Sequence, residues 1–211
     1  MTQTITGYNS KSNPCRAPLS AEEQLRIWND LIPGLAVGDA RERFRRPLHP
    51  CASHSFIMPS PYAIANSPQA GLRKLLTLKR ESIRFDEWLL REEFNDHEYD
   101  DSLYAFHEIL ERDRVGDFWV IQVSFKNTQA EYRGGDYEAA GILLTHPRIL
   151  QHDSPGSCLD CPGVKISETG RGLSRMVRFF KRGNVYWMMR CTMSFFHTGR
   201  SALGFFVPGQ M

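Results

Sequence analysis

The chain has 211 residues, of which 41% are hydrophobic and 11% aromatic, and a net charge of +2 at pH 7. This composition can fill a core, so it excludes a wholly disordered chain. Its apolar runs are far shorter than the roughly 20 residues of a membrane-spanning helix, and the polar N-terminus lacks the apolar segment of a signal peptide. We therefore expect a soluble intracellular protein, cytoplasmic or nuclear, that does not bind a membrane.

The first half of the chain is predicted to be mainly helical. Residues 1–18 are rich in Thr, Ser, Asn and Pro, which predicts a disordered tail. Ser20 and Glu23 have the spacing of a capping box, so a helix is expected to begin after Ser20. The four prolines within residues 38–66 predict an irregular segment, because proline lacks a backbone N–H and restricts the residue before it. Further helices are predicted near residues 68–83, 86–94 and 102–115.

After residue 116 the pattern becomes that of strands. The run FWVIQVSF is rich in aromatic and β-branched residues, and the sequence Arg-Gly-Asn at 182–184 suits the tight turn of a hairpin. The run 137–145 is apolar but contains Ala and Gly, so it is predicted as a weak strand. Strands are expected at 118–125, 137–145, 164–168, 175–181, 185–196 and 203–207.

These elements together predict an α+β fold. N-terminal helices are expected to pack on a C-terminal twisted antiparallel sheet of five or six strands, which can close toward a barrel. Behind the tail, residues 19–211 are predicted to form one domain, with a helical half at 19–116 and a sheet half at 117–211.

Five cysteines are too few, and odd in number, for a disulfide framework in a chain of this size. Cys158 and Cys161 have the C-x₂-C spacing that lets two thiolates bind one Zn²⁺, and Cys51 with His54 forms a C-x₂-H pair. The two pairs together predict a structural zinc site. The alternatives are reduced cysteines in loops or a redox function, because more than a hundred residues separate the pairs.

Charge is unevenly distributed along the chain. Residues 81–113 contain twelve acidic and three basic residues, whereas residues 162–211 contain eight basic and one acidic residue. In the basic part, cationic side chains alternate with aromatic ones, a combination that binds single-stranded nucleic acid on sheets. An acidic protein partner, or the acidic helices of the same chain, would fit the charge equally well. The predicted binding residues are Arg175, Arg178, Lys181, Arg182, Tyr186, Arg190 and Phe196.

An enzyme is the alternative interpretation. His146 and His152 are the candidates for general acid–base catalysis, in a small-molecule pocket of the curved sheet. No nucleophile elbow, phosphate-binding loop, His-Glu-x-x-His motif or complete dinucleotide fingerprint is present, so no reaction class is indicated. The sequence therefore favours a non-catalytic binding module for nucleic acid or an acidic protein, with no oligomeric state indicated.

Overall fold

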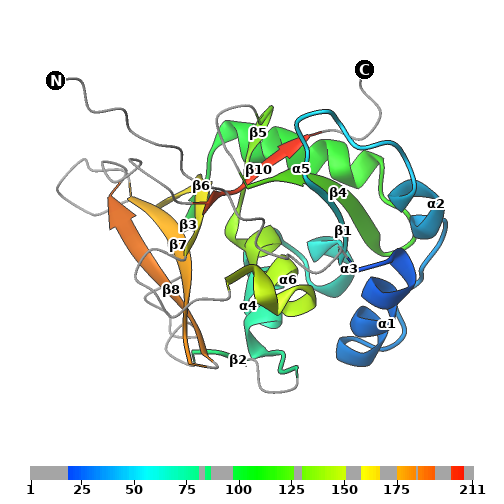
Figure 1. Ribbon diagram of the computed structural model, residues 1–211, viewed down its shortest axis with the longest axis horizontal. Coiled ribbons are helices and arrows are strands. Elements are labelled where there is room, and N and C mark those ends of the chain that lie inside the picture. Colours follow the sequence, from blue (N-terminus) through cyan, green and yellow to red (C-terminus); the bar gives the residue numbers. More distant parts are fainter. Residues whose placement is uncertain are drawn as a thin grey trace, which may run out of the picture.

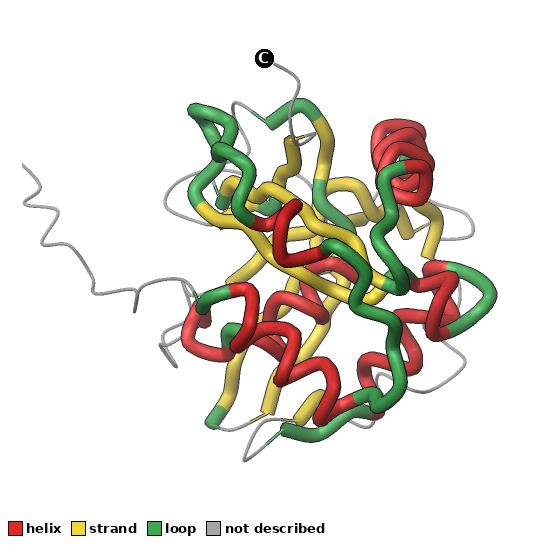
Figure 2. The backbone as a smooth tube through the Cα atoms, turned by 90° about the vertical axis from the view of Figure 1, so that its right-hand side faces the viewer, coloured by secondary structure: helices red, strands yellow, loops and turns green. Residues whose placement is uncertain are grey.

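The fold is α+β, as predicted, and contains two sheets with one helix between them. The computed structural model describes residues 19–80, 84–86, 97–125, 130–150, 158–166, 175–183, 185–192 and 201–206. Figure 1 shows helix α6 (Asp136–Thr145) near the centre, with the two sheets to its left and right. Figure 2, a side view, shows further helices around the strands. The predicted tail and most of the helix predicted at 86–94 lie outside the described residues.

The first sheet has four strands in the order β1, β4, β10 and β5. Neighbouring strands are antiparallel, and His54 lies opposite Val123 in the β1–β4 pair. The strand predicted at 118–125 is confirmed as β4, and every residue of β4 is buried. The strands are β1 (His54–Pro59), β4 (Phe118–Ser124), β5 (Tyr132–Arg133) and β10 (Gly204–Phe206).

The second sheet has the order β2, β8, β7, β6 and β3, with β9 beside β6. The predicted hairpin is confirmed, because β7 and β8 pair in antiparallel register through a turn at Gly183, whose φ is +56°. Strand β6 is longer than the predicted edge strand at 164–168 and lies inside the sheet. The strands are β2 (Arg84–Phe85), β3 (His97–Tyr99), β6 (Cys158–Ile166), β7 (Arg175–Arg182), β8 (Val185–Thr192) and β9 (Ser201–Ala202).

Four of the described helices begin at a residue whose side chain caps the first turn. The predicted capping box is confirmed, since the Ser20 side chain accepts from the Glu23 N–H and the Glu23 carboxylate accepts from the Ser20 N–H. Among the described residues, no helix is long and apolar enough to cross a membrane. The remaining helices are α1 (Ala21–Leu31), α2 (Ala40–Phe44), α3 (Pro61–Ile64), α4 (Pro68–Thr77), α5 (Asp101–Arg112) and the 3₁₀ helix η4 (Pro147–Leu150).

The strand predicted at 137–145 is wrong, because these residues form helix α6. All ten residues of α6 are buried, so the helix has no polar face and its sequence lacks the 3.6-residue period of an amphipathic helix. Small residues suit this environment. A Cβ on Gly141 would lie 2.7 Å from the Met58 Cε atom of β1, so glycine allows close packing there.

The irregular segment predicted at 38–66 is also wrong in part, since it contains β1. Pro59 is the last residue of this strand, where a missing N–H interrupts no pairing with β4. The outer edge of β1 is covered by α1. Gln24 accepts a hydrogen bond from the Ile57 N–H (2.9 Å), and the Trp28 indole donates to the Ile57 carbonyl (2.6 Å). Two side chains of a helix thus satisfy the backbone of an edge strand.

Candidate functional site

The β7–β8 hairpin has one face toward the core and one away from it. Side chains alternate along a strand, and Val177, Phe179 and Met188 are buried in the core. The opposite face carries Phe180, Trp187 and Arg182, which we call the hairpin face. Phe180 and Trp187 are cross-strand partners whose ring centroids lie 6.5 Å apart at an interplanar angle of 20°. Both rings are half-buried and Arg182 is exposed.

The predicted binding residues therefore do not share one surface. Tyr186 is buried on the core face, where its hydroxyl donates to the Pro147 carbonyl at 2.6 Å. Lys181 is its cross-strand partner on the same side of the sheet. Arg182 alone lies exposed on the hairpin face. The backbones of Arg175 and Arg190 belong to β7 and β8, but their side chains, like Phe196, lie outside the described part of the structure.

Arg178 has a structural environment. It is buried and forms two hydrogen bonds with the Asp160 carboxylate of β6, one of them 2.8 Å long from Nη2 to Oδ2. This bidentate contact lies on the same side of the sheet as Phe180, but both partners are removed from solvent. Arg178 is therefore expected to hold the hairpin in place rather than to contact a ligand.

The zinc prediction receives no support from the register of β6. Cys158 lies opposite Phe180 and Cys161 lies opposite Val177 in a run without a register shift, so the two side chains leave opposite faces of the sheet. His54 is the first residue of β1 in the other sheet, and Cys51 lies in the turn before this strand. In the part of the chain that the structure describes, no group of three or more His, Cys, Asp or Glu side chains could hold a metal ion.

His146, the described member of the predicted acid–base pair, lies at the C-terminal end of α6; His152 is outside the described residues. The Nδ1 atom of His146 is 2.8 Å from the Thr145 hydroxyl oxygen. That hydroxyl lies 3.1 Å from the carbonyls of Gly141 and Ile142, to which it donates. The Thr145 hydroxyl oxygen therefore accepts a hydrogen bond from the Nδ1–H of His146. In this tautomer the buried Nε2 atom of His146 carries a lone pair. Burial, with smaller effects of His54 and Arg80, lowers the pKa of His146 to about 4.

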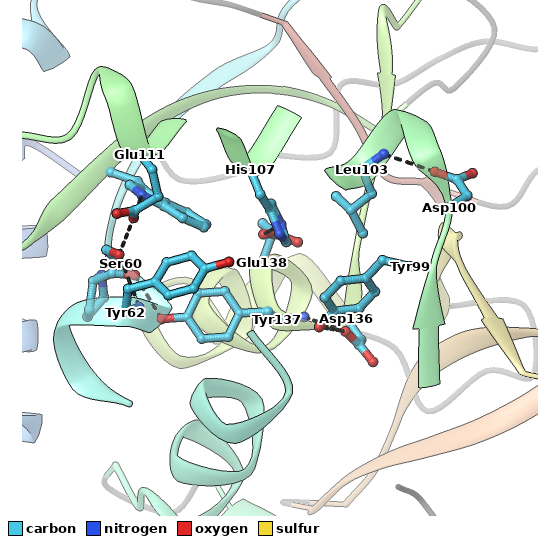
Figure 3. A network of polar contacts seen from close by, with 12 residues as sticks. Ser60, Tyr62, Tyr99, Asp100, Leu103, His107, Glu111, Asp136, Tyr137 and Glu138 are labelled. Carbon is cyan, nitrogen blue, oxygen red and sulfur yellow. Dashed lines mark hydrogen bonds and ion pairs between the residues drawn. The ribbon is translucent and has the colours of Figure 1, made fainter. Parts of the chain in front are cut away.

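A second group of polar side chains lies beneath the surface between α5 and the first turn of α6 (Figure 3). We call Tyr99, His107, Asp136 and Glu138 the buried polar network. His107 Nε2 lies 2.6 Å from Glu138 Oε1, and the two side chains are 3% and 0% exposed. The Tyr99 hydroxyl donates to Asp136 Oδ1 at 3.0 Å. All four side chains are thus removed from bulk water.

The start of α6 stabilises these acids. Asp136 and Glu138 lie in its first turn, where the N-terminal end of the helix dipole favours negative charge. The Tyr137 N–H donates to Asp136 Oδ1 at 2.9 Å. Burial, followed by the charge of Asp136, raises the pKa of Tyr99 well above its usual value, so Tyr99 keeps its proton and remains a donor.

The network lies near exposed tyrosines. Tyr62 of α3 and Tyr104 of α5 are 44% and 46% exposed, and the Tyr104 ring is 5.7 Å from the Tyr99 ring. The Glu111 carboxylate accepts hydrogen bonds from the Ser60 hydroxyl and the Trp119 indole. Figure 3 shows the Tyr62 ring lying beside Tyr137, with its hydroxyl directed to the side of His107 and Glu138. The exposed tyrosine rings and the buried acidic side chains thus lie in the same region of the protein.

The sequence prediction missed this network. Two signals were available: His107 interrupts the apolar stripe of α5 between Phe106 and Leu110, and two acids precede the apolar run of α6. Neither signal shows that the two segments meet, because His107 and Glu138 are 31 positions apart in the sequence.

Comparison of the chain with protein-family models, with curated proteins and with solved structures finds no significant match.

Proposed function

We propose that the chain is a non-catalytic binding module and that the hairpin face binds single-stranded nucleic acid. The observation that carries this proposal is the Phe180–Trp187 pair, two half-buried rings that lie nearly parallel on the side of the hairpin away from the core. Aromatic rings on a sheet are common stacking surfaces for bases, and stacking tolerates any base sequence. The exposed guanidinium of Arg182, two positions from Phe180 on the same face, can contact a phosphate.

The net positive charge of residues 162–211 supports the same ligand. A polyanion is attracted to a basic region over about a Debye length, which is ~8 Å at physiological salt. The stacking contribution per base is about 1–3 kcal/mol, and it does not depend on salt in the way that phosphate contacts do. Rings and cations therefore make separable contributions to affinity. The proposal includes no zinc site, because Cys158 and Cys161 leave opposite faces of β6.

The test is fluorescence anisotropy with labelled oligo-dT and oligo-U at several salt concentrations. Trp187→Ala is expected to weaken binding about tenfold, the ratio that one lost stacking contact produces. Arg182→Glu is expected to weaken binding and to reduce the slope of log affinity against log salt by about one. Arg26→Glu is the matched control, because Arg26 is an exposed arginine on α1. It should leave binding unchanged apart from the general effect of net charge.

Two outcomes would overturn the proposal. If neither oligonucleotide binds the wild type, the hairpin face does not bind nucleic acid. If both bind but Trp187→Ala changes nothing, the attraction is electrostatic only. The acidic protein partner then becomes the better interpretation, and polyglutamate should compete with the oligonucleotide as effectively as unlabelled oligo-dT does.

A second candidate function has one observation in its favour. His146 has a tautomer set by Thr145 and an Nε2 lone pair that can accept a proton, although burial lowers its pKa to about 4 and so makes it a weak base at neutral pH. If His146 serves an enzyme, hydrolysis of p-nitrophenyl acetate by the wild type should exceed hydrolysis by His146→Gln at least about tenfold. His49→Gln is the matched control, since the His49 ring is stacked on Phe206. Equal rates in all three proteins would remove the enzyme alternative.

A further inference from the structure

Tyr62 of α3 and Tyr104 of α5 are aromatic side chains at the protein surface. They are 44% and 46% exposed, and in the described part of the chain Leu48 is the one other large hydrophobic residue exposed to this extent. Tyrosine is enriched in protein interfaces, because its ring buries a large apolar area while its hydroxyl stays hydrogen-bonded. Two exposed tyrosines from different helices therefore mark a candidate contact surface for a partner.

The parts of the chain that carry these rings are held in place from below. The Ser60 hydroxyl donates to the Glu111 carboxylate of α5 and accepts from the Tyr62 N–H at 3.1 Å, so α3 is tied to α5 (Figure 3). The Tyr104 ring lies 5.7 Å from the ring of Tyr99, which is buried. A surface that is already ordered loses less conformational entropy when a partner binds.

The charge beside the two rings is negative. Burial, followed by the charges of Glu111, Tyr104 and Glu108, raises the pKa of Tyr62 above its usual value. Glu108 follows Tyr104 by four positions in α5, so their side chains lie one above the other on the same face of the helix. We call Tyr62, Tyr104 and Glu108 the tyrosine patch. Its charge favours a cationic partner over nucleic acid or another anion.

Of the two nearby glutamates, Glu108 is the one available to a partner. The Glu111 carboxylate accepts from the Ser60 hydroxyl and the Trp119 indole. Glu108 lies 3.4 Å from Arg112, and these side chains are 71% and 79% exposed. An ion pair this exposed contributes little to stability, so the cation of a partner can replace Arg112 at little cost.

An arginine side chain fits this combination better than a lysine does. The guanidinium group is planar and weakly hydrated, so it stacks on the face of a tyrosine ring, and its parallel N–H groups match a carboxylate. The lysine ammonium is compact and strongly hydrated, and it keeps more of its water at an exposed site. The rings and the carboxylate together therefore indicate arginine.

We propose that the tyrosine patch binds an arginine side chain from a basic segment of a partner protein. The guanidinium stacks on the Tyr104 ring and donates to the Glu108 carboxylate one turn further along α5. Tyr62 adds apolar contact area on the side of α3. The contact is made at the surface and requires no cavity. It does not depend on the proposed nucleic-acid function, because it uses none of the residues of the hairpin face.

The test is an NMR titration of the full chain, with ¹³C-labelled tyrosine rings, against the peptide acetyl-Arg-Gly-Arg-amide. The ring signals of Tyr62 and Tyr104 should move and saturate, with a dissociation constant in the millimolar range or tighter. Acetyl-Lys-Gly-Lys-amide has the same charge and should bind about two- to fivefold more weakly.

Variants locate the contact. Glu108→Gln and Tyr104→Leu should each weaken binding of the arginine peptide about two- to fivefold. Asp30→Asn is the matched control, because Asp30 is an exposed carboxylate on α1 and the change removes the same charge. It should change the affinity less than about 1.5-fold, since exposed charges beyond a Debye length are screened.

Four results would overturn the proposal. The comparison of the two peptides uses the wild type alone, so it does not depend on how well a variant folds. Ring signals that do not saturate, or equal affinities for the two peptides, would contradict the assignment of arginine. Equal effects of Glu108→Gln and Asp30→Asn would mean that only net charge attracts the peptide. Tyr104 signals that change with protein concentration alone would make a second copy of the chain the occupant.

Discussion

Replacing Gln24 with leucine tests how the open edge of β1 is stabilised. Gln24 is fully buried on α1. Its Oε1 accepts from the Ile57 N–H at 2.9 Å, and its Nε2 donates to the carbonyls of Leu19 at 3.0 Å and Ser55 at 3.5 Å. Leucine has a similar volume but no polar atoms. The substitution therefore leaves the Ile57 N–H without an acceptor in the core.

The expected loss can be derived from these contacts. A buried backbone group left without a partner costs about 1–3 kcal/mol, and Ile57 N–H is the clearest case because its residue is 1% exposed. The leucine side chain offsets part of this free-energy cost, since an apolar group is buried more easily than an amide. We expect a net loss of about 2 kcal/mol in the free energy of unfolding, or about 4–8 °C in Tm for a chain of this size.

Urea unfolding followed by circular dichroism measures this difference. The midpoint should fall while the m-value stays constant, because the same surface is exposed on unfolding. Gln69→Leu is the matched control, since Gln69 is half-buried on α4. It should change stability by less than about 0.5 kcal/mol. If Gln24→Leu is as stable as the wild type, side chains of α1 do not satisfy the edge of β1, and this part of the reasoning is wrong.

Three further predictions concern buried groups. Arg178→Met removes the partner of the buried Asp160 carboxylate, so urea titration should show a loss of about 3–5 kcal/mol, and adding Asp160→Leu should restore most of it. The folded-state pKa of His146 is lowered from 6.5 to about 4, so only the unfolded chain gains this proton as the pH falls through that interval. Stability is therefore fully present above pH 6.5 and is lost toward pH 4, by on the order of 2–3 kcal/mol, and His146→Gln should remove this component from the pH profile. Gly135→Ala places a methyl group against Glu138 Oε2 and should lower Tm, with a cost of about 1–3 kcal/mol.

Each of these predictions has a result that contradicts it. A double variant no more stable than Arg178→Met would mean that the buried Asp160 charge is not the source of the loss. A pH profile identical in wild type and His146→Gln would assign the acid loss to other groups. For Gly135→Ala, an unchanged Tm would mean that Leu103 and Glu138 move aside at no cost.

Local sequence determined several elements on its own. The capping box of Ser20 and Glu23, the strand of β4 and the β7–β8 hairpin were all predictable, because caps, β-branched runs and turn residues act over a few positions. The α+β class follows from these elements. The predicted division into a helical half and a sheet half differs from the structure in two places. Strand β1 of the first half pairs with β4, and helix α6 of the second half lies between the sheets.

Tertiary structure decided the elements whose residues are buried on all sides. The sequence of α6 has an apolar run that is compatible with either a strand or a helix, and only packing against Met58 and its neighbours selects the helix. Pro59 argued against a strand at β1, yet it ends the strand, where no partner on β4 needs its N–H.

The candidate sites depend on tertiary structure most of all. Strand alternation and register placed Tyr186 in the core and Arg182 outside, although both belong to the same basic and aromatic sequence. The contact between His107 and Glu138 joins α5 to α6 and could not be derived from either segment alone. Sequence determines a local conformation when neighbouring residues provide the interactions. Which polar groups meet in the core depends on the packing of distant segments, because only packing removes them from water together.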